Sequence, residues 1–216
     1  MCPMNKIVSR FDKKLIPGLE LVQFEGRIFT IDSELEARKA TDFLMHERIV
    51  GVDTETKPVF KKGRMMNPVA LMQVSTLDTC FLFRLNRIGL PDCLVDLLQG
   101  DEVLKVGLSL QDDFRQLGRR RSINPCCYVE LQQMVREFGI TDMSLAKLYA
   151  NLFGCRISKS QQLSNWEADV LSERQKRYAA TDAWACVRIY NELNRIRKEG
   201  YVCEIIPEPV PEEGQG

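Results

Sequence analysis

Two acids separated by one residue, Asp53 and Glu55, follow the apolar run Ile49–Val52. If this run is a strand, the alternation of its side chains puts both carboxylates on the same face. Adjacent carboxylates repel each other and raise each other's pKa unless a cation neutralises them. Mg²⁺ and Mn²⁺ take oxygen ligands, so the pair could bind a divalent metal ion. The pair alone is also compatible with an ordinary turn after a buried strand, with both acids in solvent.

A second pair of acids, Asp112 and Asp113, stands at the start of a helix predicted over Gln111–Leu117. Acids in the first turn of a helix interact favourably with its dipole, and this alone could explain them. The preceding run Val103–Gly107 is typical of a strand, so either acid could also face the end of the strand that carries Asp53.

A third candidate is the pair Tyr178 and Asp182, in the helix predicted from Glu173 to Arg197. Their spacing of four puts both side chains on one helical face, about one turn apart. Taken alone, Tyr178 could be a half-buried core residue and Asp182 a solvated helix acid. Together with the strand acids they would complete a cluster of carboxylates and one phenol.

The elements that must position these residues are those of an α/β protein. Short connections make the first three strands antiparallel neighbours, and helical crossovers make the last two parallel to the first. The sequence therefore predicts a mixed five-stranded sheet flanked by helices, preceded by a small hairpin over Leu21–Phe24 and Arg27–Ile31. The five strands are predicted at Ile49–Thr54, Val69–Ser75, Cys80–Leu85, Val103–Gly107 and Asn124–Val129.

Helical periods account for most of the remaining chain. Ser33 and Glu36 form a capping-box pattern at the start of the first helix. That helix ends near His46, the only histidine of the chain, for which we expect a structural role. The other helices are predicted at Pro91–Leu98, Gln111–Leu117, Leu131–Phe138, Leu145–Phe153 and Glu173–Arg197.

The 216 residues are 44% hydrophobic and 28% charged, which is typical of a globular protein with a real core. We expect an N-terminal arm at 1–20, one domain at 21–200 and an acidic, disordered tail at 201–216. No segment approaches the roughly 18 apolar residues of a membrane span, and the N-terminus lacks a signal-peptide pattern. The eight cysteines form no C-x-x-C pair, so we expect a reducing, cytoplasmic location.

Taken in order, the acidic motifs resemble those of the DEDD superfamily of 3′–5′ exonucleases, in its tyrosine-bearing (DEDDy) branch. That branch includes ribonuclease D and the exonuclease domain of the Werner syndrome helicase. The spacing from Gly107 matches Asp113, and not Asp112, to the third acid of the family. The matching text is Gly51-Val52-Asp53-Thr54-Glu55, Lys105-Val106-Gly107 with Asp113, and Tyr178-Ala179-Ala180-Thr181-Asp182; supporting matches are Ala70–Ser75 and Leu163–Trp166.

The resemblance implies a ribonuclease-H-like fold and a metal-dependent 3′–5′ exonuclease with two divalent ions, Mg²⁺ or Mn²⁺. It implies that Asp53, Glu55 and Asp182 bind one ion, and that Asp53 and Asp113 hold the second. Tyr178 would orient the attacking water or the scissile phosphate. The implied substrates are nucleic acids with single-stranded 3′ ends or with recessed or overhanging duplex ends, and the implied products are nucleoside 5′-monophosphates.

A sister branch carries a histidine five residues before the last aspartate, where this chain has Arg177. A histidine general base is therefore excluded in that role. The alternative function is a catalytically silent nucleic-acid-binding module of the same fold, which would be expected to lack one or more of the five site residues. All five are present: Asp53, Glu55, Asp113, Tyr178 and Asp182.

Contacts to the nucleic acid are less well defined by the sequence. Two basic clusters could contact phosphates or could be ordinary surface charge. Trp166 and Trp184 could stack on bases or could pack in the core. The basic clusters are Lys57, Lys61, Lys62 and Arg64, and Arg119–Arg121.

Overall fold

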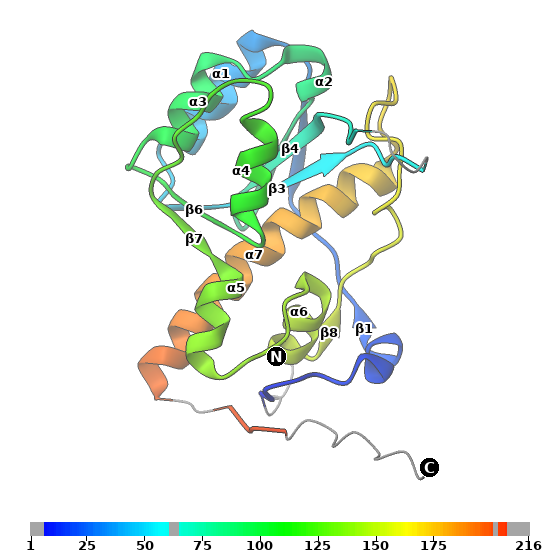
Figure 1. The fold of residues 1–216 in the computed structure, drawn as a ribbon, viewed down its shortest axis with the longest axis vertical. Helices are drawn as coiled ribbons and strands as arrows, with labels where there is room; N and C mark the ends of the chain where they lie inside the picture. The colour runs from blue at the N-terminus through cyan, green and yellow to red at the C-terminus, as the bar shows by residue number, and fades with distance from the viewer. Residues whose placement is uncertain (1–6, 61–64, 201–202, 207–216) are drawn as a thin grey trace.

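A computed structural model describes residues 7–60, 65–200 and 203–206. Within these ranges a mixed six-stranded sheet of order β2-β5-β4-β3-β6-β7 forms the centre of the fold, with a separate two-stranded sheet, β1-β8 (Figure 1). The strands are β1 (Glu20–Leu21), β2 (Arg27–Ile31), β3 (Ile49–Thr56), β4 (Val69–Ser75), β5 (Thr79–Phe83), β6 (Leu104–Gly107), β7 (Tyr128–Glu130) and β8 (Cys155–Arg156).

Helices cover both faces of the large sheet. The 3₁₀ helices are η1 (Lys13–Gly18) and η2 (Val135–Phe138). The α-helices are α1 (Glu34–Leu44), α2 (Leu85–Ile88), α3 (Asp92–Gln99), α4 (Leu110–Leu117), α5 (Leu131–Met134), α6 (Leu145–Phe153) and α7 (Glu173–Glu199). The predicted α/β class, with a mixed sheet between helices, is confirmed.

The predicted order of the central strands is also confirmed. Strand β3 is antiparallel to β4, and β4 is antiparallel to β5. Strands β6 and β7 follow helical crossovers and run parallel to β3. Since the connections are short in the first case and helical in the second, strand direction follows from the local sequence pattern.

The predicted N-terminal hairpin is wrong. Strand β1 pairs in parallel with β8, and β2 pairs in parallel with β5 at the edge of the large sheet. The sheet therefore has six strands among the described residues, and not five. Each of the two segments forms a strand, but its partner lies far away in the sequence. The short Glu25-Gly26 link between the segments suggested a hairpin, and it contained no information about these distant partners.

Several predicted boundaries shift by a few residues. Strand β5 ends at Phe83, because the chain turns into α2 at Leu85. Strand β7 begins only at Tyr128, because Cys127 has a left-handed backbone with φ of 48°. The helix predicted over Leu131–Phe138 changes from α5 into the 3₁₀ helix η2.

Two hydrophobic layers lie on opposite faces of the sheet. One contains side chains of α1, α3 and α4 packed on Val50 and Val52 of β3. The other contains α7 with α5 and α6. Because side chains alternate along β3, Gly51, Asp53 and Glu55 belong to the face that α7 covers.

No helix within the described ranges combines the length and the apolar character needed to cross a membrane. The predicted tail falls outside the described residues except for 203–206.

Candidate active site

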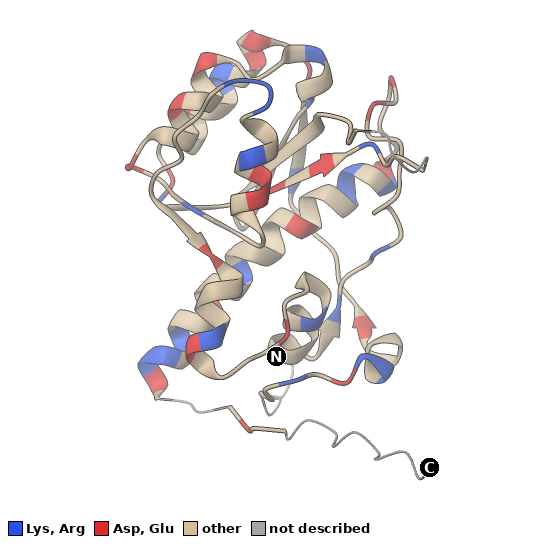
Figure 2. Ribbon diagram, viewed as in Figure 1, with Lys and Arg blue, Asp and Glu red and all other residues tan. Residues whose placement is uncertain are grey.

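Three carboxylates from β3 and α7 meet at the centre of the molecule. One oxygen atom each of Asp53, Glu55 and Asp182 lies within 4.8 Å of the others. Glu55 and Asp182 are each 8% exposed, and Asp53 is half-buried. Acidic segments of β3, α4 and α7 converge at this place (Figure 2). Carboxylates that far apart in the sequence come together only because α7 crosses directly over β3.

Small residues allow that close crossing. A Cβ atom added at Gly51 would lie 1.9 Å from the carbonyl oxygen of Ala183 on α7. Ala179, Ala180 and Ala183 are fully buried on the same helix. The absence of side chains here lets the helix backbone rest on the strand, and this brings Asp182 up to Asp53.

Asp113 reaches the site from the first turn of α4. Its Oδ1 accepts a 2.6 Å hydrogen bond from the Thr54 hydroxyl, and its buried Oδ2 has no hydrogen-bond partner among the described residues. The turn before α4 is set by Ser109, which has a left-handed φ of 64° and donates its N–H to Glu130 Oε1 at 2.9 Å.

Asp112, the neighbouring acid, lies away from the cluster. It is exposed and forms a 2.8 Å ion pair with Arg115, also exposed, one helical turn later. An exposed pair of this kind contributes little to stability. The structure therefore separates two adjacent acids that the helix pattern alone could not distinguish.

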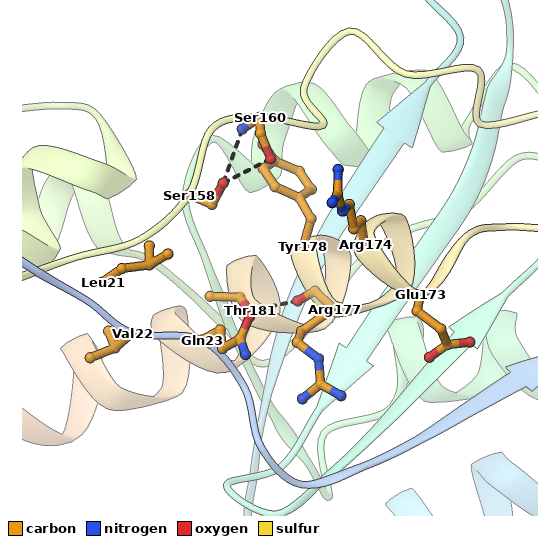
Figure 3. A pocket seen from close by; sticks show the side chains of 10 residues that line it. All are labelled: Leu21, Val22, Gln23, Ser158, Ser160, Glu173, Arg174, Arg177, Tyr178 and Thr181. Atoms are coloured by element: carbon orange, nitrogen blue, oxygen red, sulfur yellow. Dashed lines mark hydrogen bonds between the residues drawn. The ribbon is translucent and has the colours of Figure 1, made fainter.

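Tyr178 lies beside the carboxylates, on the wall of the cleft that contains them. The cleft also includes Asp53, Glu55 and Asp182. Tyr178 is half-buried, and its ring centroid lies 6.0 Å from that of the fully buried Trp166. It also lines an adjoining cavity, where it lies next to Ser160 and Arg174 (Figure 3).

Burial and mutual repulsion raise the pKa values of the acids. Burial, followed by the charges of Asp53, Asp182 and Asp113, raises the pKa of Glu55 to about 10. Burial raises the pKa of Asp53 to about 6, and burial with the charge of Asp53 raises that of Asp113 to about 8. The same two causes raise the pKa of Asp182 well above its ordinary value. Without a cation, the site therefore retains protons at neutral pH.

The donor set fits a hard divalent cation. All the clustered ligand atoms are carboxylate oxygens, which suit Mg²⁺ or Mn²⁺. The unpartnered Oδ2 of Asp113 is a further buried acceptor without a donor among the described residues. A cation would remove the repulsion that raises these pKa values.

Sequence reasoning missed two residues that hold the acids in place. Gln73 is fully buried on β4, directly opposite Asp53 in the register, and its amide donates to Asp53 Oδ2 at 2.9 Å. Thr54 holds Asp113 through its hydroxyl. The role of Gln73 could have been inferred from the sequence, because a glutamine stands there in an otherwise apolar strand that is predicted to pair with the Asp53 strand.

The candidate phosphate-binding arginines and base-stacking tryptophans mostly have structural contacts. Arg120 donates to the carbonyl of Val69 at 2.6 and 2.9 Å, and Arg121 forms a 2.5 Å ion pair with Asp92. Trp166 is fully buried in the core. Lys61, Lys62 and Arg64 lie outside the described residues.

Comparisons with known proteins identify the family of the chain. The 3′–5′ exonuclease family matches residues 28–197. Over 207 residues the chain is 34% identical to the exonuclease 3′–5′ domain-containing protein 2 of Drosophila melanogaster, covering 90% of this chain and 33% of that protein. Over 154 residues it is 31% identical to the bifunctional 3′–5′ exonuclease/ATP-dependent helicase WRN of Mus musculus, covering 68% of this chain and 11% of that protein.

Among solved structures, the EXO domain of Nibbler from Aedes aegypti superposes with a TM-score of 0.75 at 22% identity. The superposition covers 84% of this chain and 95% of that domain, and it shows a shared fold. The chain itself spans about a third or less of the two relatives above.

Fold and acidic cluster place the chain in the class of α/β nucleases with a ribonuclease-H-like sheet. Within that class, the chain belongs to the 3′–5′ exonuclease family, since the family match covers most of its length. The resemblance to 3′–5′ exonucleases seen in the motifs is thereby confirmed.

Proposed function

We propose that this chain removes nucleotides from the 3′ ends of nucleic acids by hydrolysing phosphodiester bonds, with nucleoside 5′-monophosphates as products. The observation that supports this most directly is the meeting of Asp53, Glu55, Tyr178 and Asp182 in one cleft, with Asp113 of α4 held beside it by the hydroxyl of Thr54 on β3.

Two divalent ions, Mg²⁺ or Mn²⁺, are proposed as the cofactors. Asp53, Glu55 and Asp182 would hold one ion, and Asp53 with Asp113 the second. When bound, such a pair lowers the pKa of a water molecule and neutralises charge on the attacking and leaving oxygens. Gln73 and Thr54 support this arrangement, because their hydrogen bonds restrict the carboxylates of Asp53 and Asp113.

Tyr178 is proposed to orient the reacting groups as a hydrogen-bond donor. Burial, followed by the charges of Asp182 and Glu55, raises the pKa of Tyr178 above its ordinary value. The phenol therefore stays protonated at neutral pH and does not act as a general base. Its hydroxyl can donate to the attacking water or to a phosphate oxygen while that water attacks phosphorus and the bond to the 3′ oxygen breaks.

The proposed partner is a nucleic acid with a single-stranded 3′ end, or a duplex with a recessed or overhanging end. We further propose residues 21–200 as the exonuclease domain, with 1–20 as an arm and 201–216 as a tail. A cytoplasmic location is proposed from the reduced cysteines; Cys80, Cys93 and Cys186, for example, are free thiols.

A cleavage assay tests the proposed function. DNA and RNA strands of one sequence, single-stranded or as duplexes with recessed ends, carry a label at the 5′ or the 3′ end and are incubated with Mg²⁺ or Mn²⁺. We expect stepwise shortening of the 5′-labelled strands and release of labelled mononucleotide from the 3′-labelled strands. Both should be absent with EDTA and in Asp53→Ala. Internal cuts, or full activity in EDTA, would contradict the proposal.

A further inference from the structure

A basic groove lies next to the catalytic cleft. It has a volume of 540 Å³ and lies between η1, the start of α6 and the chain after β8. Ser144, Ala146, Ile157 and Lys159 line both the groove and the cleft. The two therefore adjoin, and a strand with its 3′ end in the cleft has the groove directly beside it.

The charged side chains that line the groove are all positive. Its described lining includes Lys13, Lys147, Arg156 and Lys159 and no acidic side chain. Lys147 is partly neutralised by a 2.8 Å ion pair with the buried Asp142. Lys13 and Lys159 are exposed, so their charges are available to a ligand. Ile16, Pro17 and Ile157 add apolar surface between the cations.

Specific contacts hold the outer wall of the groove in place. The N–H of Phe11 donates to Asp142 Oδ2 at 2.6 Å, just before η1. After η1, Arg156 Nε donates to the carbonyl of Leu19 at 3.0 Å, and β1 pairs with β8. Asp142 therefore connects the arm to Lys147, and Arg156 connects it to the strand that leads to the cleft. The wall is preorganised, which reduces the entropy lost on binding.

The geometry of η1 selects which of its lysines faces the groove. A 3₁₀ helix has about three residues per turn, so side chains three apart share a face. Lys13 and Ile16 accordingly line the groove, and the adjacent Lys14 does not. Both lysines are exposed and lie on the same short helix, so they form a matched pair that differs only in direction.

Lys159 connects the groove electrostatically to the catalytic acids. Burial and the charge of Asp53 raise the pKa of Asp182, and the positive charge of Lys159 lowers it in part. This cation therefore lies close enough to influence the site while it also lines the groove.

We infer that this groove binds the sugar–phosphate backbone of the substrate strand on the 5′ side of the scissile bond. The inference rests on the proposed function and adds a path for the strand. Single strands bind in positively charged grooves that follow the backbone, and this groove has that charge and adjoins the cleft. Helix η1 precedes residues 28–197, so the N-terminal segment adds this wall outside the region matched to the family.

Binding of labelled strands tests the groove. Single strands of about 12 nucleotides, as DNA and as RNA, are titrated into full-length Asp53→Asn protein, in which hydrolysis is blocked, and fluorescence anisotropy is followed. We expect Lys13→Glu and Lys159→Glu each to weaken binding about fivefold, and the slope of log K against log salt to fall by about 0.7 for each. Lys14→Glu, with the same change in net charge, should weaken binding less than twofold. The DNA and RNA arms show which backbone the groove accepts.

Two outcomes would overturn the inference. Equal weakening by Lys13→Glu and Lys14→Glu would mean that only overall charge matters, and an unchanged affinity in Lys13→Glu and Lys159→Glu would remove the groove from the strand's path. Melting temperatures verify that each variant is folded. The cleavage assay separates this result from the proposed function. If wild type shortens strands, and Lys13→Glu does so with the same KM, the groove is refuted and the exonuclease activity is not. Wild type that cleaves nothing refutes the exonuclease, while the anisotropy still decides the groove.

Discussion

Among single residues, Gln73 contacts a proposed metal ligand, Asp53, directly. Its amide group donates to Asp53 Oδ2 at 2.9 Å from the neighbouring strand, in a fully buried position. This hydrogen bond orients the carboxylate and lowers its pKa against the larger effect of burial, which raises it. Gln73 is thus a positioning residue that acts through Asp53.

Replacing Gln73 with Met keeps the side-chain length and removes the hydrogen bond to Asp53. We expect the metal concentration for half-maximal activity to rise about tenfold, because groups that orient metal ligands typically contribute that much. The KM for the nucleic acid should change little. Metal titrations of the cleavage rate measure both quantities, and a Gln73→Met enzyme with an unaltered metal requirement would show that Asp53 is held by other contacts.

Tyr178→Phe removes one hydroxyl and keeps the ring that packs near Trp166. If the hydroxyl orients the water or the phosphate, kcat should fall about 10²-fold while the affinity for the strand stays the same. Single-turnover rates and anisotropy measure the two separately. A decrease in affinity with normal kcat would assign Tyr178 to binding only.

His46→Ala is the matched control for the tyrosine substitution. His46 is exposed, two residues after the end of α1, and its Nδ1 lies 2.7 Å from the carbonyl oxygen of Asp42. The kcat of His46→Ala should equal that of wild type. A loss of orders of magnitude would mean that a histidine takes part in the reaction.

Between elements, the contact of α7 with β3 decides whether a site exists at all. Helix α7 begins with a capping box between Ser172 and Gln175, and a row of alanines faces the sheet. Gly51 on the strand has no side chain, and the carbonyl group of Ala183 occupies the space where a Cβ atom would lie. The position of Asp182 relative to Asp53 therefore depends on one close backbone contact.

Gly51→Ala should separate the helix from the strand. We expect a loss of about 3 kcal/mol in the free energy of unfolding, since the Cβ meets backbone that has no room to move. Activity should fall about 10²-fold, because catalysis is sensitive to displacements near 1 Å. Gly18→Ala is the control for stability, since a Cβ there meets nothing within 4 Å. If the unfolding curves of Gly51→Ala and Gly18→Ala coincide, the steric argument is refuted.

For the whole molecule, the buried acids couple stability to pH. The folded pKa values of Asp53, Asp113 and Glu55 are raised to about 6, 8 and 10, whereas the unfolded values are about 4. Above about pH 4 the folded state binds more protons than the unfolded state, so stability falls as pH rises toward these folded values. The metal-free protein should therefore be more stable in mild acid than at neutral pH.

Thermal unfolding in EDTA at about pH 5.5 and about pH 7.5 measures this coupling. The melting temperature should be lower at the higher pH, and the difference should shrink in Asp182→Asn. Mn²⁺ should raise the melting temperature more at the higher pH, where the ligands lose protons more easily, and more in wild type than in Asp182→Ala. Equal shifts in the two proteins would argue against a shared site.

The sequence by itself determined the central strands, the cap of the first helix and the identity of the acids. These features depend on local patterns: alternation in β3, the capping box at Ser33, and the spacing of Tyr178 and Asp182. Local patterns can be read directly because each element obeys the geometry of its own backbone.

Only the tertiary structure decided which distant segments meet. The pairing of β2 with β5 and of β1 with β8, the hydrogen bond from Gln73 to Asp53, and the groove beside η1 all join residues far apart in the chain. Local periodicity defines a face of an element but does not name its partner. The partner is set by packing and hydrogen bonding across the whole fold, and that is why four acids scattered over the sequence form one site.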